Sequence, residues 1–133
     1  MDIIEDVLSK YKKIAVVGMS DNPARDSLKI ARYMHKQGYT VYGVNPKLDG
    51  KVVDGMKCYS VLKDIPDTIE IVDIFRRPDA VVGVVEEVLK LDYKVPVIWT
   101  QIGVGNPEAQ RIAEDNGIIY IDNRCLYIEH SNL

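Results

Sequence analysis

Short apolar runs alternate with longer amphipathic stretches along most of the chain. The runs are rich in valine and isoleucine and are short, which is typical of buried parallel strands. The longer stretches repeat apolar residues at helical spacing, as Leu28, Ala31 and Met34 do. This alternation predicts helices that separate strands at 13–17, 40–44, 69–75, 95–100 and 118–121.

Cap and turn residues support the boundaries of these elements. Gly18 ends the first strand, and Gly38 follows the helix predicted at 26–37, where a positive φ is common. Pro78 is placed at the start of the next helix, and Asn106-Pro107 is typical of an N-cap followed by a helix-starting proline. The other segments are expected to form a helix at 3–11, a polar loop at 47–55, an optional edge strand at 58–59, a brief helix capped by Ser60 and running to 65, and a tail at 122–133 that forms a final helix or simply packs down.

Strands that alternate with helices favour one architecture. We expect an α/β fold: a Rossmann-like, doubly wound parallel sheet of about five strands with helices on both faces, in three layers. The pattern contains no repeat, low-complexity segment or linker, so residues 1–133 are expected to form a single domain.

Composition and charge narrow the classes of function. The 133 residues carry a net charge of −3, which argues against broad binding to nucleic acid or to a membrane surface. No apolar run approaches the ~20 residues of a membrane span, and the acidic first residues do not resemble a signal peptide. The two cysteines, Cys58 and Cys125, do not make a disulfide framework. We expect a cytoplasmic protein that binds a small molecule, with a homodimer as the default assembly.

Ligands of such sheets bind at the carboxyl ends of the strands. The first strand ends at Gly18, and Met19 and Ser20 lead from it toward a helix. In this arrangement, backbone N–H groups at a helix N-terminus can meet a phosphate. The remaining strand ends carry polar or cationic segments at 44–47, 75–78, 100–103 and 122–125.

Two features argue against a dinucleotide dehydrogenase. The loop after the first strand has one glycine, whereas the dinucleotide fingerprint requires three. An acidic residue normally follows the second strand of an NAD site, but the segment 45–47 places Lys47 there, which suits a phosphate on the ribose. Arg25 and the pair Arg76-Arg77 add positive charge to the same rim. The pattern therefore favours a ligand with a diphosphate and a further phosphate.

Five blocks of residues carry a resemblance to a known family over about 13–129. The blocks are Val17-Gly18-Met19-Ser20 with Pro23 and Arg25, Gly38-Tyr39 with Val44-Asn45-Pro46, Phe75-Arg76-Arg77-Pro78, Trp99-Thr100-Gln101 with Gly103, and Asn123-Arg124-Cys125. With these blocks in this order, the chain resembles the small CoA-binding proteins, a Rossmann-type family. It is more distantly similar to the N-terminal CoA-binding domain of the succinyl-CoA synthetase α subunit.

The resemblance implies a coenzyme A site. The residues that it implicates are Gly18, Met19, Ser20, Arg25, Val44, Asn45, Pro46, Lys47, Phe75, Arg76, Pro78 and Gln101. The first loop would hold the diphosphate through backbone N–H groups, with Arg25 on a phosphate. The segment 44–47 would line the adenosine, with Lys47 near the ribose phosphate. The segment 75–78 would flank the adenine or the pantetheine arm, and Gln101 would face the arm further along.

Three functions stay open from the sequence. The leading interpretation is a carrier, sensor or buffer of CoA or an acyl-CoA without ligase chemistry, because neither His35 nor His130 lies at a predicted strand end and no second domain is expected. His130 is expected to be exposed. The alternative is an enzyme that acts on a CoA thioester or a nucleotide-linked substrate through Cys125, a residue that could instead be a buried inert thiol or form a mixed disulfide with CoA. The third is a regulatory module whose partner surface responds to the ligand. We expect no metal site.

Overall fold

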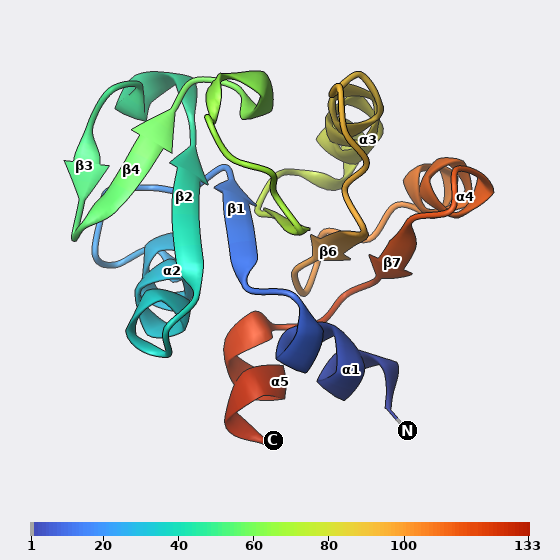
Figure 1. Ribbon diagram of the computed structural model, residues 1–133, viewed down its shortest axis with the longest axis horizontal. Helices are drawn as coiled ribbons and strands as arrows, with labels where there is room; N and C mark the ends of the chain where they lie inside the picture. The colour runs from blue at the N-terminus through green and yellow to red at the C-terminus, as the bar shows by residue number, and fades with distance from the viewer. Residues whose placement is uncertain (1) are drawn as a thin grey trace.

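The computed structural model describes residues 2–133, which form one seven-stranded sheet with the strand order β3-β4-β2-β1-β5-β6-β7. The strands, shown in Figure 1, are β1 Lys13–Val17, β2 Thr40–Val44, β3 Val52–Val53, β4 Met56–Tyr59, β5 Ile71–Ile74, β6 Val97–Thr100 and β7 Ile119–Ile121. All neighbours pair in parallel except β3 and β4, which pair antiparallel.

Helices cover both faces of the sheet (Figure 1). They are α1 Ile3–Lys10, α2 Asp26–Lys36, α3 Val81–Leu89, α4 Pro107–Asp115 and α5 Leu126–Ser131, with short 3-10 turns at Pro46–Leu48, Leu62–Asp64 and Pro78–Ala80. One apolar core lies between the sheet and α1, α2 and α5, and includes Met34 and Trp99. A second lies between the sheet and α3 and α4, and includes Val85 and Ile98. The three-layer α/β fold predicted from the sequence is therefore confirmed.

The predicted elements are present, with several corrections at their edges. The segment 58–59 belongs to β4, which is an inner strand because β3 lies outside it; the expected loop at 47–55 contains β3 and a 3-10 turn. The helix expected at 60–65 is only the 3-10 turn Leu62–Asp64, and Ser60 does not cap it. Pro78 begins a 3-10 turn that leads into α3, and the tail forms α5. Asn106 caps α4 as expected, because its Oδ1 accepts the Ala109 N–H at 3.0 Å.

Gly18 sits where three strand ends meet. Its φ is +88°, and a Cβ at this position would lie 2.1 Å from the carbonyl oxygen of Phe75. Its N–H donates to the Val44 carbonyl at 2.8 Å, so the residue links the ends of β1 and β2 while touching the end of β5. Only glycine satisfies both the left-handed backbone and the close approach.

We expect Gly18→Ala to destabilise the fold by more than about 2 kcal/mol, because it adds a steric clash to the cost of a positive φ. Gly38→Ala is the matched control: Gly38 has φ +93°, but a Cβ there would meet no atom within 4 Å. That variant should lose only about 1 kcal/mol. Urea denaturation of both variants measures the difference, and equal losses would contradict the clash.

Candidate functional site

A cleft of about 1310 Å³ opens at the carboxyl ends of β1, β5 and β6. Its walls come from the β1–α2 loop, α2 as far as Tyr33, the segment after β5, the loop after β6 and the start of α5. The sequence-predicted residues that line it are Gly18, Ser20, Arg25, Phe75, Arg76, Pro78 and Gln101. Thus predicted residues from three separate segments, 18–25, 75–78 and 101, are brought together in space.

The other predicted residues lie beside the cleft and do not line it. The side chain of Met19 is fully buried and packs toward Gly43, where a Cβ would lie 2.5 Å from the Met19 Cε. Asn45 shapes the neighbouring turn: its Nδ2 donates to the Met19 carbonyl at 3.0 Å, and its Oδ1 accepts the Lys47 N–H at 3.0 Å. Val44 is buried, whereas Pro46 and Lys47 are exposed at the end of β2.

Hydrogen bonds within the β1–α2 loop decide which N–H groups are free. The Ser20 N–H donates to the Ser27 hydroxyl at 3.0 Å, and the Ser20 hydroxyl accepts the Asn22 N–H at 2.9 Å. The Gly18 N–H is also bonded, to the Val44 carbonyl. The N–H groups that could meet a phosphate are therefore those of the first turn of α2, and not those of Gly18 and Ser20. There the N–H groups of Asp26 and Ser27 have no helical carbonyl in reach, as in any helix N-terminus.

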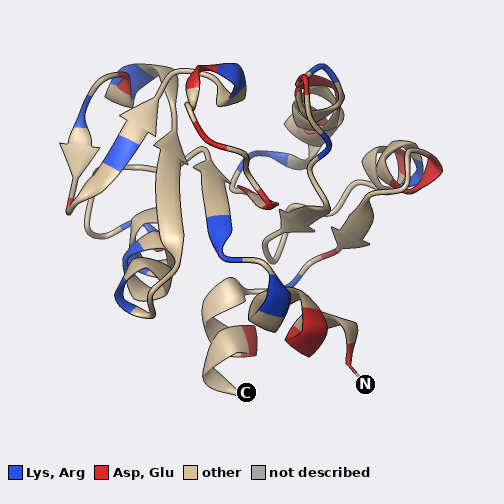
Figure 2. Ribbon diagram, in the orientation of Figure 1, with Lys and Arg blue, Asp and Glu red and all other residues tan. Residues whose placement is uncertain are grey.

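Positive charge gathers around the same end of the cleft, although the chain as a whole is acidic. Arg25 and Lys29 line the cleft from α2, and Arg76 and Arg77 line it from the segment after β5. Figure 2 shows Lys and Arg on both of these elements. Arg77 also lies 3.5 Å from Asp79, but this exposed pair contributes little. The local field therefore favours an anionic ligand.

A buried polar pair lies beneath the cleft. Gln101 lines the cleft, and its Nε2 donates to Oδ1 of Asp73 at 2.8 Å. Asp73 is fully buried in β5, and its Oδ2 has no hydrogen-bond partner. Burial raises the pKa of Asp73 to about 8, although the Gln101 hydrogen bond opposes the shift. At pH 7 this carboxyl group is therefore mainly neutral.

Of the cleft wall at α5, the sequence placed only Cys125 at the rim; the contribution of Tyr127 and Ile128 from α5 was not predicted. Cys125, Tyr127 and Ile128 line the cleft opposite Ile30 and Tyr33 of α2. Cys125 is half-buried there, so it is neither a fully buried thiol nor a freely exposed one. An apolar helix face at a chain end gives no distinctive sequence signal for a ligand site.

Aromatic contacts hold α5 against α2. The ring centroids of Tyr33 and Tyr127 are 4.6 Å apart in an edge-on arrangement. The Tyr33 hydroxyl lies 2.8 Å from Nδ1 of His130, to which it donates when that nitrogen carries no proton. The expectation of an exposed His130 is thus wrong: the ring is half-buried, and burial together with the charge of Lys12 lowers its pKa.

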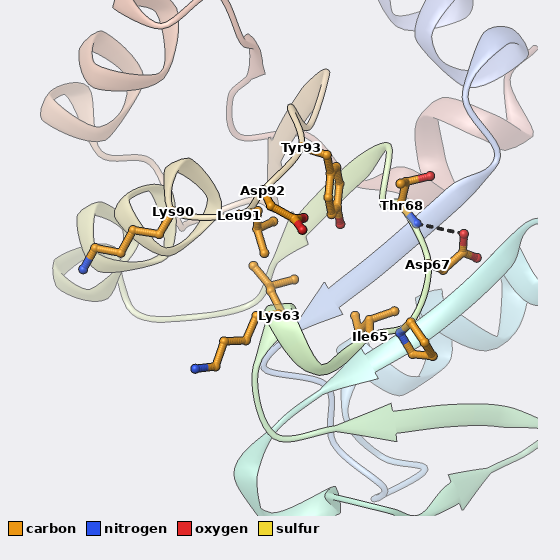
Figure 3. A pocket seen from close by; sticks show the side chains of 10 residues that line it. Lys63, Ile65, Asp67, Thr68, Lys90, Leu91, Asp92 and Tyr93 are labelled. Atoms are coloured by element: carbon orange, nitrogen blue, oxygen red, sulfur yellow. Dashed lines mark hydrogen bonds between the residues drawn. The ribbon is translucent and has the colours of Figure 1, made fainter.

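A second pocket, of about 620 Å³, lies at the opposite, amino ends of β5 and β6 (Figure 3). Two of its polar side chains are already partnered: Asp67 accepts from Lys13 and Tyr42 at 2.8 Å each, and the Tyr93 hydroxyl accepts the Ile69 N–H at 2.9 Å. The amino group of Lys63 extends outward (Figure 3). This pocket offers a ligand no unmet polar group comparable to Asp73.

Neither a metal centre nor a membrane span is found among residues 2–133. The described part of the chain holds no cluster of three or more His, Cys, Asp or Glu side chains suited to a metal ion. None of its helices is long and apolar enough to cross a bilayer.

The buried carboxyl group predicts an unusual dependence of stability on pH. Aspartate in an unfolded chain has a pKa of about 3.9, so the native state binds more protons than the unfolded state between about pH 4 and 8. Stability should fall as the pH rises through this window. Asp73→Asn removes the ionisable group and should be more stable than the wild type at pH 9 by about 1–3 kcal/mol, with little gain at pH 4.

Urea denaturation at the two pH values measures this effect, and Asp79→Asn serves as the control because Asp79 is an exposed carboxylate near the same cleft. Parallel pH profiles for Asp73→Asn and the wild type would contradict a neutral buried acid.

Comparison with known proteins agrees with this geometry. A family model described as "CoA binding domain" matches residues 12–131. The chain is 39% identical over 128 residues to the uncharacterized protein YneT of Bacillus subtilis, covering 96% of this chain and 92% of that protein. A hypothetical protein from Pyrococcus horikoshii OT3 superposes with a TM-score of 0.90 at 42% identity, covering 98% of this chain and 89% of the other.

Larger enzymes contain a similar segment. The chain is 30% identical over 132 residues to the ADP-forming acetate–CoA ligase of Methanocaldococcus jannaschii, covering 95% of this chain but only 18% of the ligase. An acetyl-coenzyme A synthetase of Ca. Korarchaeum cryptofilum superposes with a TM-score of 0.67 at 28% identity, covering 84% of this chain and 26% of that enzyme. The resemblance predicted from the sequence is confirmed: the chain belongs to the CoA-binding domain family.

Proposed function

We propose that the chain binds coenzyme A, free or acylated, in the cleft at the carboxyl ends of β1, β5 and β6, and acts as a carrier, sensor or regulatory module. The observation that carries this proposal is the cationic cleft mouth beside the first turn of α2, in a chain of the CoA-binding domain family. Charge and free N–H groups meet there, as phosphate recognition requires.

The diphosphate is assigned to the mouth of the cleft. Arg25 precedes α2, whose first-turn N–H groups and N-terminal dipole favour an anion. Arg76 is close to Gly18 from the other side, since a Cβ on Gly18 would lie 3.1 Å from the Arg76 Cδ. A phosphate between Arg25 and Arg76 would receive charge-assisted hydrogen bonds from two elements.

The two ends of the ligand are assigned to opposite sides of this point. Lys47 is exposed at the carboxyl end of β2, where the ribose phosphate of CoA would meet a cation instead of the acid that an NAD site requires. The pantetheine arm would run over Gln101 toward α5, ending short of Tyr127 and Ile128. The amide of Gln101 offers this arm a polar group at the base of the cleft.

Binding rather than ligation is proposed from the side chains that line the cleft. The chain corresponds to 18% of the acetate–CoA ligase that it matches. The cleft-lining side chains of the described residues include no histidine, and His130 contacts Tyr33 outside the lining.

Calorimetric titration should show binding of CoA, weaker binding of dephospho-CoA, and still weaker binding of NAD. Dephospho-CoA lacks the ribose phosphate that Lys47 would meet. For NAD, the chain also lacks the acidic residue after β2 that an NAD site requires. Lys47→Ala should reduce the preference for CoA over dephospho-CoA, with the exposed Lys57→Ala as the control. Absence of heat with CoA, or a preference for NAD, would overturn the proposal.

Arg25→Ala should weaken CoA binding by about 1–3 kcal/mol, because one charge-assisted hydrogen bond to a phosphate is lost. The matched control is Arg111→Ala: Arg111 is an exposed arginine on α4 that pairs only with Asp115 at 3.4 Å among the described residues. Titration of both variants with CoA gives the comparison. Equal affinities for the two variants would remove Arg25 from the site.

A further inference from the structure

The cleft is charged at one end and apolar at the other. Of the large apolar side chains that stay exposed in the described structure, Ile102 (62%), Tyr127 (47%) and Ile128 (45%) all line this one cleft. Exposed apolar groups that gather around a concave surface mark a binding site more often than scattered ones do. The apolar end of the cleft is therefore expected to bind an apolar group of a ligand.

The separation of the two ends follows from α2 itself. Arg25 and Tyr33 are eight positions apart in the sequence, which corresponds to about 12 Å along a helix axis. The arginine marks the cationic end of the cleft, and the tyrosine marks its apolar end. The facing wall, α5, carries no Lys or Arg, as Figure 2 shows. A ligand that fills the cleft must be multiply anionic at one end and uncharged and apolar at the other.

The apolar wall is also held in place before any ligand arrives. The edge-on contact of Tyr33 with Tyr127 and the Tyr33–His130 hydrogen bond fix α5 against α2. Trp99 donates its indole N–H to the Arg124 carbonyl at 2.8 Å, which anchors the segment leading into α5. A preformed apolar surface loses little conformational entropy when a flexible chain packs on it.

We propose that the physiological ligand is a medium-chain acyl thioester of CoA, whose acyl chain lies between α2 and α5 against Ile30, Tyr127 and Ile128. This inference rests on the proposed function, since the nucleotide must occupy the cationic end. In CoA the thiol lies at the end of the molecule remote from the phosphates, so a thioester extends the ligand in the direction of the apolar wall.

The test is calorimetric titration with CoA, acetyl-CoA, butanoyl-CoA and hexanoyl-CoA, which are short enough to stay monomeric. Hexanoyl-CoA should bind roughly tenfold more tightly than acetyl-CoA, because several CH₂ groups leave water on one side of a half-open wall. Equal affinities across the series, with CoA still bound, would overturn the acyl site and leave the proposed function standing. No binding of any member would overturn both.

Two variants test whether the apolar wall formed by α5 binds the acyl chain. Ile128→Ser should abolish most of the gain with chain length while the affinity for free CoA stays within about twofold, since the nucleotide contacts lie elsewhere. Leu89→Ser is the matched control, because Leu89 is also exposed and apolar but lies on α3 outside the cleft. If Ile128→Ser weakened free CoA and hexanoyl-CoA by the same factor, the wall would serve the pantetheine arm, and the acyl assignment would be wrong.

Discussion

The close approach at Gly18 is the constraint on which the cleft depends. A residue with a Cβ cannot turn out of β1 here, because the Phe75 carbonyl oxygen occupies that space. The turn allows the Gly18 N–H to donate to the Val44 carbonyl, and the Phe75 N–H donates to the Val17 carbonyl at 2.8 Å. These hydrogen bonds fix the ends of β2, β1 and β5 to one another. Only then do Arg25 on one segment and Arg76 on another face the same volume.

Much of the fold could be predicted from the sequence because its signals are local. Short apolar runs placed β1, β2, β5, β6 and β7, and Asn106-Pro107 placed the start of α4. The two-residue strand β3 is too short to show periodicity. A turn signal existed, since Asp54 and Gly55 both adopt positive φ between β3 and β4, as Asp-Gly pairs in tight hairpins do.

The candidate site was only half predictable, for a physical reason. Residues that follow strands share one rim in any parallel sheet, so Gly18, Arg25, Arg76 and Gln101 could be grouped before the structure was known. Side-chain hydrogen bonds, such as that from the Ser20 N–H to the Ser27 hydroxyl, decide which N–H groups stay free. Such hydrogen bonds cannot be inferred from the sequence. The apolar wall of α5 likewise becomes a wall only when α5 packs against α2.

Asp73 connects the stability of the fold to the chemistry of the cleft. Within the strand Ile71–Ile74 an acid interrupts a buried apolar run, which is unfavourable for folding and therefore typical of a functional position. As a neutral acid it adds no negative charge beneath a cleft whose mouth is cationic. Once ionised, it would oppose an anionic ligand nearby. By linkage, an anion in the cleft must raise the pKa of Asp73 further, so ligand and proton favour each other's binding. If an anion binds there, the same buried group that lowers stability at high pH would also couple occupancy of the cleft to pH.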